Sequence, residues 1–417
     1  MSIDILLEKE YKFEGAIEKR HIIEGLILPT LVLPPEGRED FQTGNYENCA
    51  IWTGMYVAAQ SLKYASTGNT AARANAKRGL LALHRLRDIT KGKTLIARGY
   101  KYAASSEWDE EFFWKKKGDN TRQGEEWHQN GSYRWLGDPS KSQVFGMVFG
   151  YFAFTQFCGP DAQEKEDIAG NLSEIVEQLI KDDFKIVDAD GKASGYGNYL
   201  HNHYWGFGGT GPLLILGMFK LAAAITQKIE YEKWHIKFLD KYQSSLGRCR
   251  LDLPVLKEFS TALGSEDNLV MLNYYMLMCL ETNPEIRKLC RQGMEKRVRA
   301  IDDPENSLFN FLYHASTGSE TSALQTGIDA LYRFPEEKTV PLVALKRKLP
   351  DSKIQNLGNY WNLQRKPIER RPVDEYLWRV NPWREDSWRD GRKGIIEFTG
   401  VDFLLAIYLG MKHGFVN

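Results

Sequence analysis

The sequence PLLILGMFKLAAAI, residues 212–225, is apolar on almost every face of a helix, with Lys220 as its one charged residue. A helix of this kind is buried on most sides within a large core. The segment before it, NYLHNHYWGFGGTG at 198–211, instead gathers histidine, tyrosine, asparagine, tryptophan and glycine. Polar and aromatic residues at the mouth of a buried helix are typical of functional sites. We therefore expect the rest of the chain to be scaffold and wall for 198–211.

The same unit, an apolar helix, a short turn and an amphipathic helix, recurs along the chain. The sequence predicts it at 46–66 with 70–89, 140–157 with 162–181, 212–226 with 231–242, 267–280 with 285–300, and 308–316 with 320–332. A sixth unit would pair 401–412 with a helix near 3–27 and so close a ring. About six such hairpins predict an all-α fold, an (α/α)6 toroid with apolar helices inside and amphipathic helices outside. We expect one domain over residues 1–417.

Long connections precede the apolar helices, whereas the turns that follow them are short. Residues 91–139, 183–211 and 334–399 should then lie on one face, at the amino ends of the inner helices. Those ends carry unsatisfied N–H groups that favour anionic ligands, and long loops in compact domains are usually functional. The sequence predicts a helical segment at 1–40 and a β-hairpin-like excursion at 184–196. It also predicts a long loop or lid at 334–399, a range rich in Trp, Arg and Pro.

Composition excludes several classes of protein. Lysine plus arginine equals aspartate plus glutamate, 55 each, so no global field attracts nucleic acid or an anionic membrane. The longest apolar run, 212–225, is shorter than the roughly 20 residues that span a bilayer. The five cysteines include no CxxC pair, which argues against a disulfide framework and a thiolate zinc site, and no cofactor is implied.

Localisation and assembly are less constrained by the sequence. Asp4 and Glu8 come too early for the apolar core of a signal peptide, which predicts a cytoplasmic protein, or a secreted or periplasmic one if a leader has been removed. The aromatic content permits a homo-oligomer but does not require one.

The connection at 91–139 is rich in aromatic and charged side chains. Its candidates for substrate binding are Arg98, Tyr100, Tyr133, Arg134 and Trp135. Together they predict a wall that stacks on sugar rings and binds hydroxyl or carboxylate groups. The alternative interpretation is that the long connections pack on one another through their aromatic rings.

The run Asn202-His203-Tyr204-Trp205 resembles the Asn-His step, followed closely by Tyr-Trp, of α/α-toroid polysaccharide lyases of the alginate-lyase type. The resemblance implies that Asn202 neutralises a uronate carboxylate and that His203 is the base that removes the proton from C5. A tyrosine, here Tyr204, would protonate the leaving oxygen.

Other parts of the lyase pattern are less direct. His201 and Trp205 would contact the substrate. The family also supplies an arginine and a tyrosine later in the chain, and here Arg98 with Tyr100, or Tyr133 with Arg134, would have to substitute for them. Alternatively, His201 and His203 only hydrogen-bond to loop carbonyls.

A second candidate is Asp138, in RWLGDPSKSQ at 134–143, just before a predicted apolar helix. This arrangement loosely resembles the acid/base aspartates of toroidal glycosidases, including unsaturated-glucuronyl hydrolases, which implies a general acid. Glu47 would supply a second carboxylate or a hydrogen bond to substrate. The simpler interpretations are that Asp138 caps the helix, with Pro139 in its first turn, and that Glu47 is a solvated acid at a helix start.

His314 lies inside the fifth predicted hairpin. With His203 it could form the histidine pair of an N-acylglucosamine-type epimerase, although a lone histidine is more often a satisfied core residue. The first hypothesis is therefore a carbohydrate-active enzyme that cleaves a uronic-acid-containing oligo- or polysaccharide by β-elimination. The second is a glycoside hydrolase using Asp138 and Glu47, and the third is a non-catalytic glycan-binding toroid.

Overall fold

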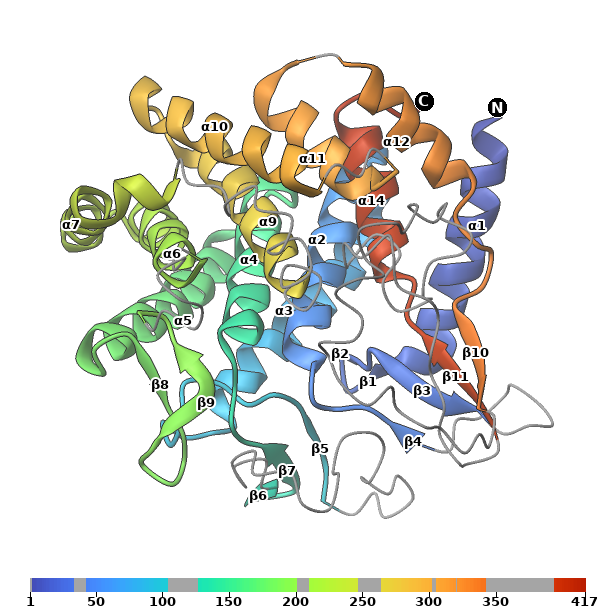
Figure 1. Ribbon diagram of the computed structural model, residues 1–417. Coiled ribbons are helices and arrows are strands. Elements are labelled where there is room, and N and C mark those ends of the chain that lie inside the picture. The colour runs from blue at the N-terminus through green and yellow to red at the C-terminus, as the bar shows by residue number, and fades with distance from the viewer. Residues whose placement is uncertain are drawn as a thin grey trace, which may run out of the picture.

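The computed structural model describes residues 2–33, 43–103, 127–200, 210–246, 264–301, 305–319, 321–342 and 394–417. Over these ranges the chain is mostly helical, with twelve α-helices and four small antiparallel sheets. The helices pack side by side, and the small sheets lie together toward one end of them (Figure 1).

Five predicted hairpins are confirmed as helix pairs. They are α2 (Cys49–Thr67) with α3 (Thr70–Asp88), α4 (Lys141–Phe157) with α5 (Ala162–Lys181), α6 (Thr210–Thr226) with α7 (Ile229–Leu246), α9 (Gly264–Leu280) with α10 (Pro284–Ile301), and α11 (Ser307–Thr317) with α12 (Ser322–Tyr332). The predicted contact between the chain ends is also present, because α14 (Val401–Lys412) packs on α1 (Ile3–Ala16).

Local sequence explains where these pairs turn. Helix α2 ends at Gly68, which has the left-handed φ of 70° that favours glycine, and the Asn69 side chain caps α3 by accepting from Ala71 N and Ala72 N. Asp161 caps α5 and forms a capping box with Glu164. Short turns with strong stop and start signals are the reason that sequence periodicity locates these helices well.

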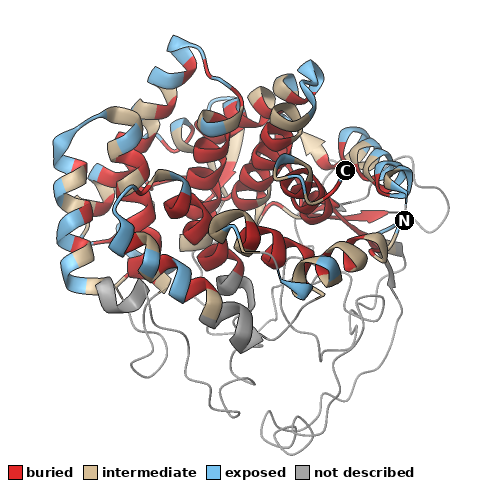
Figure 2. Ribbon diagram, turned by 90° about the horizontal axis from the view of Figure 1, so that it is seen from above, coloured by how far each residue is buried: buried red, intermediate tan, exposed pale blue. Residues whose placement is uncertain are grey.

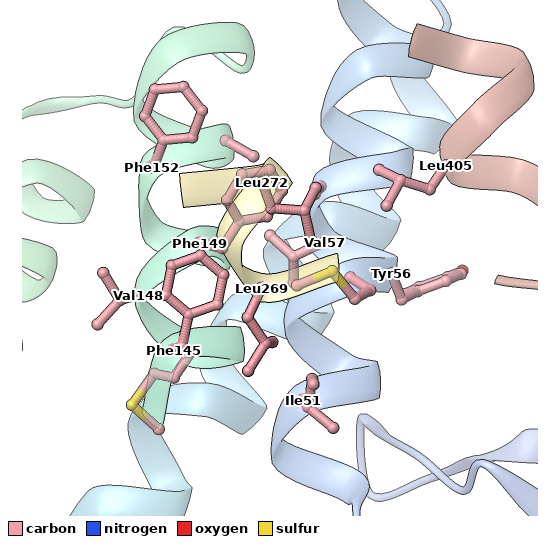
Figure 3. Close-up of a cluster of buried hydrophobic side chains, with 14 of the residues drawn as sticks. Ile51, Tyr56, Val57, Phe145, Val148, Phe149, Phe152, Leu269, Leu272 and Leu405 are labelled. Atoms are coloured by element: carbon pink, nitrogen blue, oxygen red, sulfur yellow. The ribbon is translucent and has the colours of Figure 1, made fainter. Parts of the chain in front are cut away.

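The first helix of each of these pairs is the more apolar and the more buried, as the sequence predicts. Buried residues form the middle of the molecule and exposed residues its rim (Figure 2). Apolar side chains from four helices meet in this core (Figure 3). They include Ile51, Tyr56 and Val57 of α2, Phe145, Val148, Phe149 and Phe152 of α4, Leu269 and Leu272 of α9, and Leu405 of α14.

The all-α prediction was wrong in one respect, because small sheets accompany the helices. Near the N-terminus the predicted helix ends in a short π-helix, η1 (Ile17–His21), and β1 (Ile22–Ile23), β2 (Leu26–Ile27) and β3 (Thr30–Leu33) follow. A four-stranded sheet has the order β10-β11-β3-β4, with β4 (Thr43–Gly44), β10 (Thr339–Leu342) and β11 (Gly394–Phe398). Residues 30–33, TLVL, form a strand because they pair with β11, which is more than 300 residues away in the chain. Local periodicity does not reveal such a distant partner.

Two further sheets occupy the connections before α4 and α6. One has the order β5-β7-β6, from β5 (Tyr100–Tyr102), β6 (Trp127–Asn130) and β7 (Tyr133–Leu136). The other is the predicted hairpin, formed by β8 (Lys185–Val187) and β9 (Ala193–Asn198). Of the predicted lid at 334–399, residues 343–393 lie outside the described residues, and β10 and β11 pair at its two ends. No helix in the described ranges is long and apolar enough to cross a membrane.

Helices α2 and α4 approach each other so closely that only glycine fits between them. A Cβ atom on Gly54 would overlap the carbonyl oxygen of Gly146, and one on Gly146 would overlap the Ile51 backbone. Gly150, one turn along α4, would place its Cβ 3.1 Å from the Gly54 Cα. The two backbones are therefore in direct contact, and neither helix can move aside without opening the core.

We expect Gly54→Ala and Gly146→Ala each to lower the free energy of unfolding by about 3 kcal/mol or more, because backbone atoms cannot yield as a side chain can. Urea unfolding measures this. The matched control is Gly170→Ala in α5, where a new Cβ has no atom within 4 Å and the better helix propensity of alanine should add up to about 1 kcal/mol. Equal stability of all three variants would contradict the close-contact argument.

A buried ion pair holds β11 to the end of the N-terminal helical segment. Arg20 donates from Nε and Nη2 to the two carboxylate oxygens of Glu397, at 2.8 and 2.7 Å, and His21 Nε2 lies 3.5 Å from the same carboxylate. Burial alone would raise the pKa of Glu397. The nearby His21 ring and the hydrogen bonds from Arg20 outweigh it and lower the pKa from 4.5 to about 2.

Because the pKa of Glu397 is lowered on folding, its contribution to stability is present above pH 4.5 and is lost as the pH falls toward 2. We expect Glu397→Gln to lower the free energy of unfolding by about 3 kcal/mol at neutral pH and to flatten its decline below pH 4.5. Urea unfolding between pH 7 and pH 3 tests this, with the exposed Glu230→Gln in α7 as control. An undiminished acid slope in Glu397→Gln would refute it.

Candidate functional site

Three of the predicted site residues meet where α2 and α4 begin. Arg98, which is 6% exposed, donates from Nε to the carbonyl oxygen of Asp138 at 2.7 Å and from Nη1 to that of Glu47 at 3.4 Å. The Gln143 side chain donates to the same Glu47 carbonyl oxygen. In these contacts Arg98 therefore binds main-chain carbonyls, and it joins the segment before α2 to the segment before α4.

Asp138 is buried, and its backbone is in the left-handed region with a φ of 54°. Its Oδ1 accepts from Ser194 Oγ at 2.8 Å and from Gly195 N at 2.9 Å. Its own amide donates to Asp188 Oδ2 at 2.9 Å. Aspartate tolerates left-handed backbone better than most residues, and these three hydrogen bonds to the β8–β9 hairpin hold it there.

The interpretation of Asp138 as the cap of α4 was wrong. The N-cap residue is Ser140, whose amide donates to Gln143 Oε1 at 2.9 Å, and α4 begins at Lys141 with Pro139 outside the helix. The Asp138 carboxylate is instead bonded to β9, the strand that leads into 201–209. The predicted helix start at residue 140 was therefore correct within one residue, but the Asp138 side chain bonds to β9 and not to the helix.

Glu47 lies two residues before the first residue of α2 and is half-buried, and Asn48 is the N-cap of that helix. The Glu47 amide donates to Asn45 Oδ1 at 2.8 Å. Glu47 is thus at the amino end of α2, as Asp138 is at that of α4, and Arg98 donates hydrogen bonds to the carbonyl oxygens of both residues.

The β5-β7-β6 sheet separates its residues onto two faces. On one face Tyr100, Trp135 and His128 are directly opposite one another across the strands, and Trp135 stacks on His128 with ring centroids 4.3 Å apart. Tyr100 donates from its hydroxyl to Glu24 O at 2.9 Å, and burial raises the pKa of this phenol. Tyr100 and Trp135 are fully buried, so both pack the sheet onto the body of the protein.

Tyr133 belongs to the same face. It stacks on Tyr102 with ring centroids 4.5 Å apart, and the Arg85 guanidinium of α3 lies 5.4 Å from the Tyr133 ring centroid. Three of the aromatic residues predicted to bind sugar, Tyr100, Tyr133 and Trp135, thus lie on the face that contacts Arg85 of α3. Arg134 projects to the opposite face, 5.5 Å from the Trp127 ring centroid.

His314 is a satisfied histidine. It is buried in the last turn of α11, with Nδ1 2.7 Å from Asn310 O and Nε2 2.9 Å from Thr321 Oγ1. Both ring nitrogens are therefore in hydrogen bonds within the protein. His201, Asn202, His203, Tyr204 and Trp205 lie outside the described residues, between Leu200, which follows β9, and Thr210, which begins α6.

Sequence reasoning missed several residues that shape this region. They are Lys101, Trp127, Gln143 and Ser194. Alternation in Tyr100-Lys101-Tyr102 and the Asn130-Gly131 step between WHQN and YRWL were available signals for strands and a hairpin. In contrast, no local pattern reveals that Ser194 and Gly195 bond to Asp138, more than 50 residues away.

No family model matches the chain, and no curated protein or solved structure is detectably similar to it. Among the described residues, no group of three or more histidine, cysteine, aspartate or glutamate side chains is arranged to hold a metal ion. The site must therefore be interpreted from its own geometry.

Asp138 has two structural roles, because its carboxylate accepts hydrogen bonds from β9 and its backbone adopts the left-handed conformation. Variants at this position separate the two roles. Asparagine keeps both, glycine keeps only the backbone conformation, and alanine keeps neither. We expect Asp138→Ala to lose about 2 kcal/mol or more of unfolding free energy, Asp138→Gly about 1 kcal/mol less than that, and Asp138→Asn the least. Urea unfolding gives the order. Equal losses for asparagine and alanine would show that the bonds from Ser194 and Gly195 do not stabilise the protein.

Proposed function

We propose that the helices form an (α/α)6 toroid that acts on a uronic-acid-containing glycan. The contacts between buried helices support a closed ring. Helix α2 contacts α4 and α14, α4 contacts α6, α6 contacts α9, α9 contacts α11, and α11 contacts α14. The partner helices α3, α5, α7, α10, α12 and α1 are the more exposed set, as an outer layer requires.

The observation that carries the proposal is the convergence at the amino ends of α2, α4 and α6. Glu47 and Asp138 stand before α2 and α4 and are joined by Arg98, while β9, which bonds to Asp138, leads into 201–209. The described residues on either side of 201–209 lie close together, because a Cβ on Gly211 of α6 would overlap the carbonyl oxygen of Tyr199. The Asn202-His203-Tyr204-Trp205 run belongs to the sequence between them. Helix amino ends favour anionic groups, which suits a uronate carboxylate.

The proposed reaction is β-elimination. Asn202 would hydrogen-bond to the uronate carboxylate and stabilise the charge that develops when the C5 proton leaves. His203 would take that proton, the C4–O bond would break as the C4=C5 double bond forms, and Tyr204 would protonate the leaving oxygen. The products are a new reducing end and an unsaturated uronate.

Elimination is favoured over hydrolysis by the contacts of Asp138. A glycoside hydrolase needs two carboxyl groups facing each other across a cleft, about 5–9.5 Å apart. Asp138 instead directs Oδ1 to Ser194 and Gly195, and it is buried, which suits a residue that positions the β8–β9 hairpin. Hydrolysis by Asp138 and Glu47 is the second candidate, and non-catalytic glycan binding is the third.

The test is incubation with a panel of uronate-containing polysaccharides, following the ultraviolet absorbance of an unsaturated uronate together with reducing ends. Elimination raises both signals, and we expect His203→Gln to lower turnover at least about 100-fold by removing the base. The matched control is His413→Gln, at the carboxyl end of α14, which should retain turnover.

Other results discriminate between the hypotheses. Reducing ends without absorbance would establish hydrolysis, and Asp138→Asn would then be the informative variant. Unchanged turnover in a correctly folded His203→Gln would refute the assignment of the base. Binding without either signal would favour a glycan-binding protein.

A further inference from the structure

The β8–β9 hairpin has an irregular strand beside the candidate site. Lys185 pairs with Asn198, and Val187 pairs with Ala193. Between these two pairs β8 has one residue, whereas β9 has the four residues 194–197, which are called the β9 bulge below. A β-bulge ordinarily adds a single residue, and bulges are over-represented next to active sites, where they redirect a side chain. Pairing with β8 alone therefore does not explain the length of the β9 bulge.

The β9 bulge is held at both of its ends. Ser194 donates from Oγ to Asp138 Oδ1 at 2.8 Å, and the Gly195 amide donates to the same oxygen at 2.9 Å. At the other end Gly197 packs on β8, because a Cβ there would lie 2.8 Å from the Ile186 Cβ. The residue between these two attachments is consequently fixed in place by its neighbours.

That residue is Tyr196, which is 59% exposed. Three aromatic side chains of the described residues are exposed, and the other two are in different settings. Tyr102 stacks on Tyr133, with ring centroids 4.5 Å apart, and Tyr11 lies on α1. Within the described ranges, neither a second ring nor a cation lies against the Tyr196 ring. Its flat faces are therefore open to a ligand.

The Tyr196 ring belongs to the candidate site through its neighbour in the chain. Gly195 is bonded to Asp138, which precedes α4, and Tyr196 is the next residue. The hairpin lies with the other small sheets toward one end of the helices (Figure 1). A ring that is already fixed loses little conformational freedom when a ligand stacks on it, which favours binding.

We propose that Tyr196 is a platform on which one sugar ring of the substrate stacks, held in position by the bonds of Ser194 and Gly195 to Asp138. This inference rests on the proposed function and deepens it, because it assigns one subsite of the same site and the kind of contact made there. A tyrosine ring presents an apolar face that matches the C–H face of a pyranose, while its hydroxyl group stays hydrated. Asp138 is then a positioning residue that acts on the glycan through Tyr196.

The experiment is calorimetric titration of the full-length protein with hexasaccharides of mannuronate, galacturonate and glucuronate. It uses the His203→Gln protein as parent, so that elimination does not consume the ligand. We expect this parent to bind at least one hexasaccharide and Tyr196→Ala to weaken that binding about tenfold. Tyr196→Phe keeps the ring, so its affinity should stay within about twofold of that of the parent.

The matched control is Tyr11→Ala, which removes a ring that is 77% exposed on α1, far from the hairpin (Figure 1). We expect Tyr11→Ala to leave the affinity unchanged. Thermal unfolding of each variant establishes that it is folded at the titration temperature.

A double-mutant cycle tests the positioning of the ring. Ser194→Ala removes one hydrogen bond to Asp138 and should weaken binding about threefold when Tyr196 is present. In the Tyr196→Ala protein the same substitution should have no further effect, because the ring that it positions is absent. A purely structural role of Ser194 would instead give equal losses in both backgrounds.

The outcomes separate this inference from the proposed function. A loss in Tyr196→Ala that is restored in Tyr196→Phe and absent in Tyr11→Ala supports the platform, whether or not the wild-type protein turns over polysaccharide. Unchanged affinity in Tyr196→Ala, equal losses in the alanine and phenylalanine variants, or no binding by the parent overturns the platform, even if elimination is observed. Turnover of polysaccharides by the wild-type protein, measured separately, decides the proposed function.

Discussion

The direct backbone contact between α2 and α4 is the constraint on which the site depends. Gly54, Gly146 and Gly150 allow the two helices to touch without intervening side chains. Their amino ends are consequently held close together, and the Arg98 side chain can reach carbonyl oxygens before both helices at once. A wider spacing would separate Glu47 from Asp138 and would leave the guanidinium with one partner. The core packing thus determines the geometry of residues that lie outside the core.

Two buried ion pairs hold the four-stranded sheet to neighbouring helical segments. Lys338, before β10, binds both carboxylate oxygens of Asp402 in the first turn of α14, at 3.0 and 2.9 Å, and both side chains are buried. Arg20 similarly holds Glu397 in β11. Other ion pairs with little exposure join helices, as Lys63 of α2 does with Glu10 of α1. An ion pair requires a specific geometry. It can therefore set the position of a short strand that buries too little apolar surface to set its register by packing.

Helices could be predicted from the sequence because each spans three or more turns of consistent periodicity and ends at a glycine or capping residue. Most strands could not, since they have only two to four residues and some pair with distant partners, as β3 does with β11. The β8–β9 hairpin, which pairs locally, was the exception. Asp138 could be singled out, but not its role, because Ser194 and Gly195 are brought to it only by the folded β8–β9 hairpin. Arg98 was likewise identified as a polar residue of interest, while its bonding to main-chain carbonyls depends on tertiary contact.

Strand alternation changes which residues of the predicted aromatic wall are candidates for binding. Without strands, Tyr133, Arg134 and Trp135 form one polar aromatic cluster. In β7 they alternate, so Tyr133 and Trp135 face inward with Tyr100, and Arg134 faces the other way with Lys101 and Trp127. A glycan on the inward face would have to displace the buried Tyr100 and Trp135 rings, whereas Arg134 and Trp127 on the other face are half-buried. Because successive residues of a strand project to opposite faces, the same three-stranded sheet can anchor itself through Tyr100 and Trp135 and still place Lys101 and Arg134 on its other face.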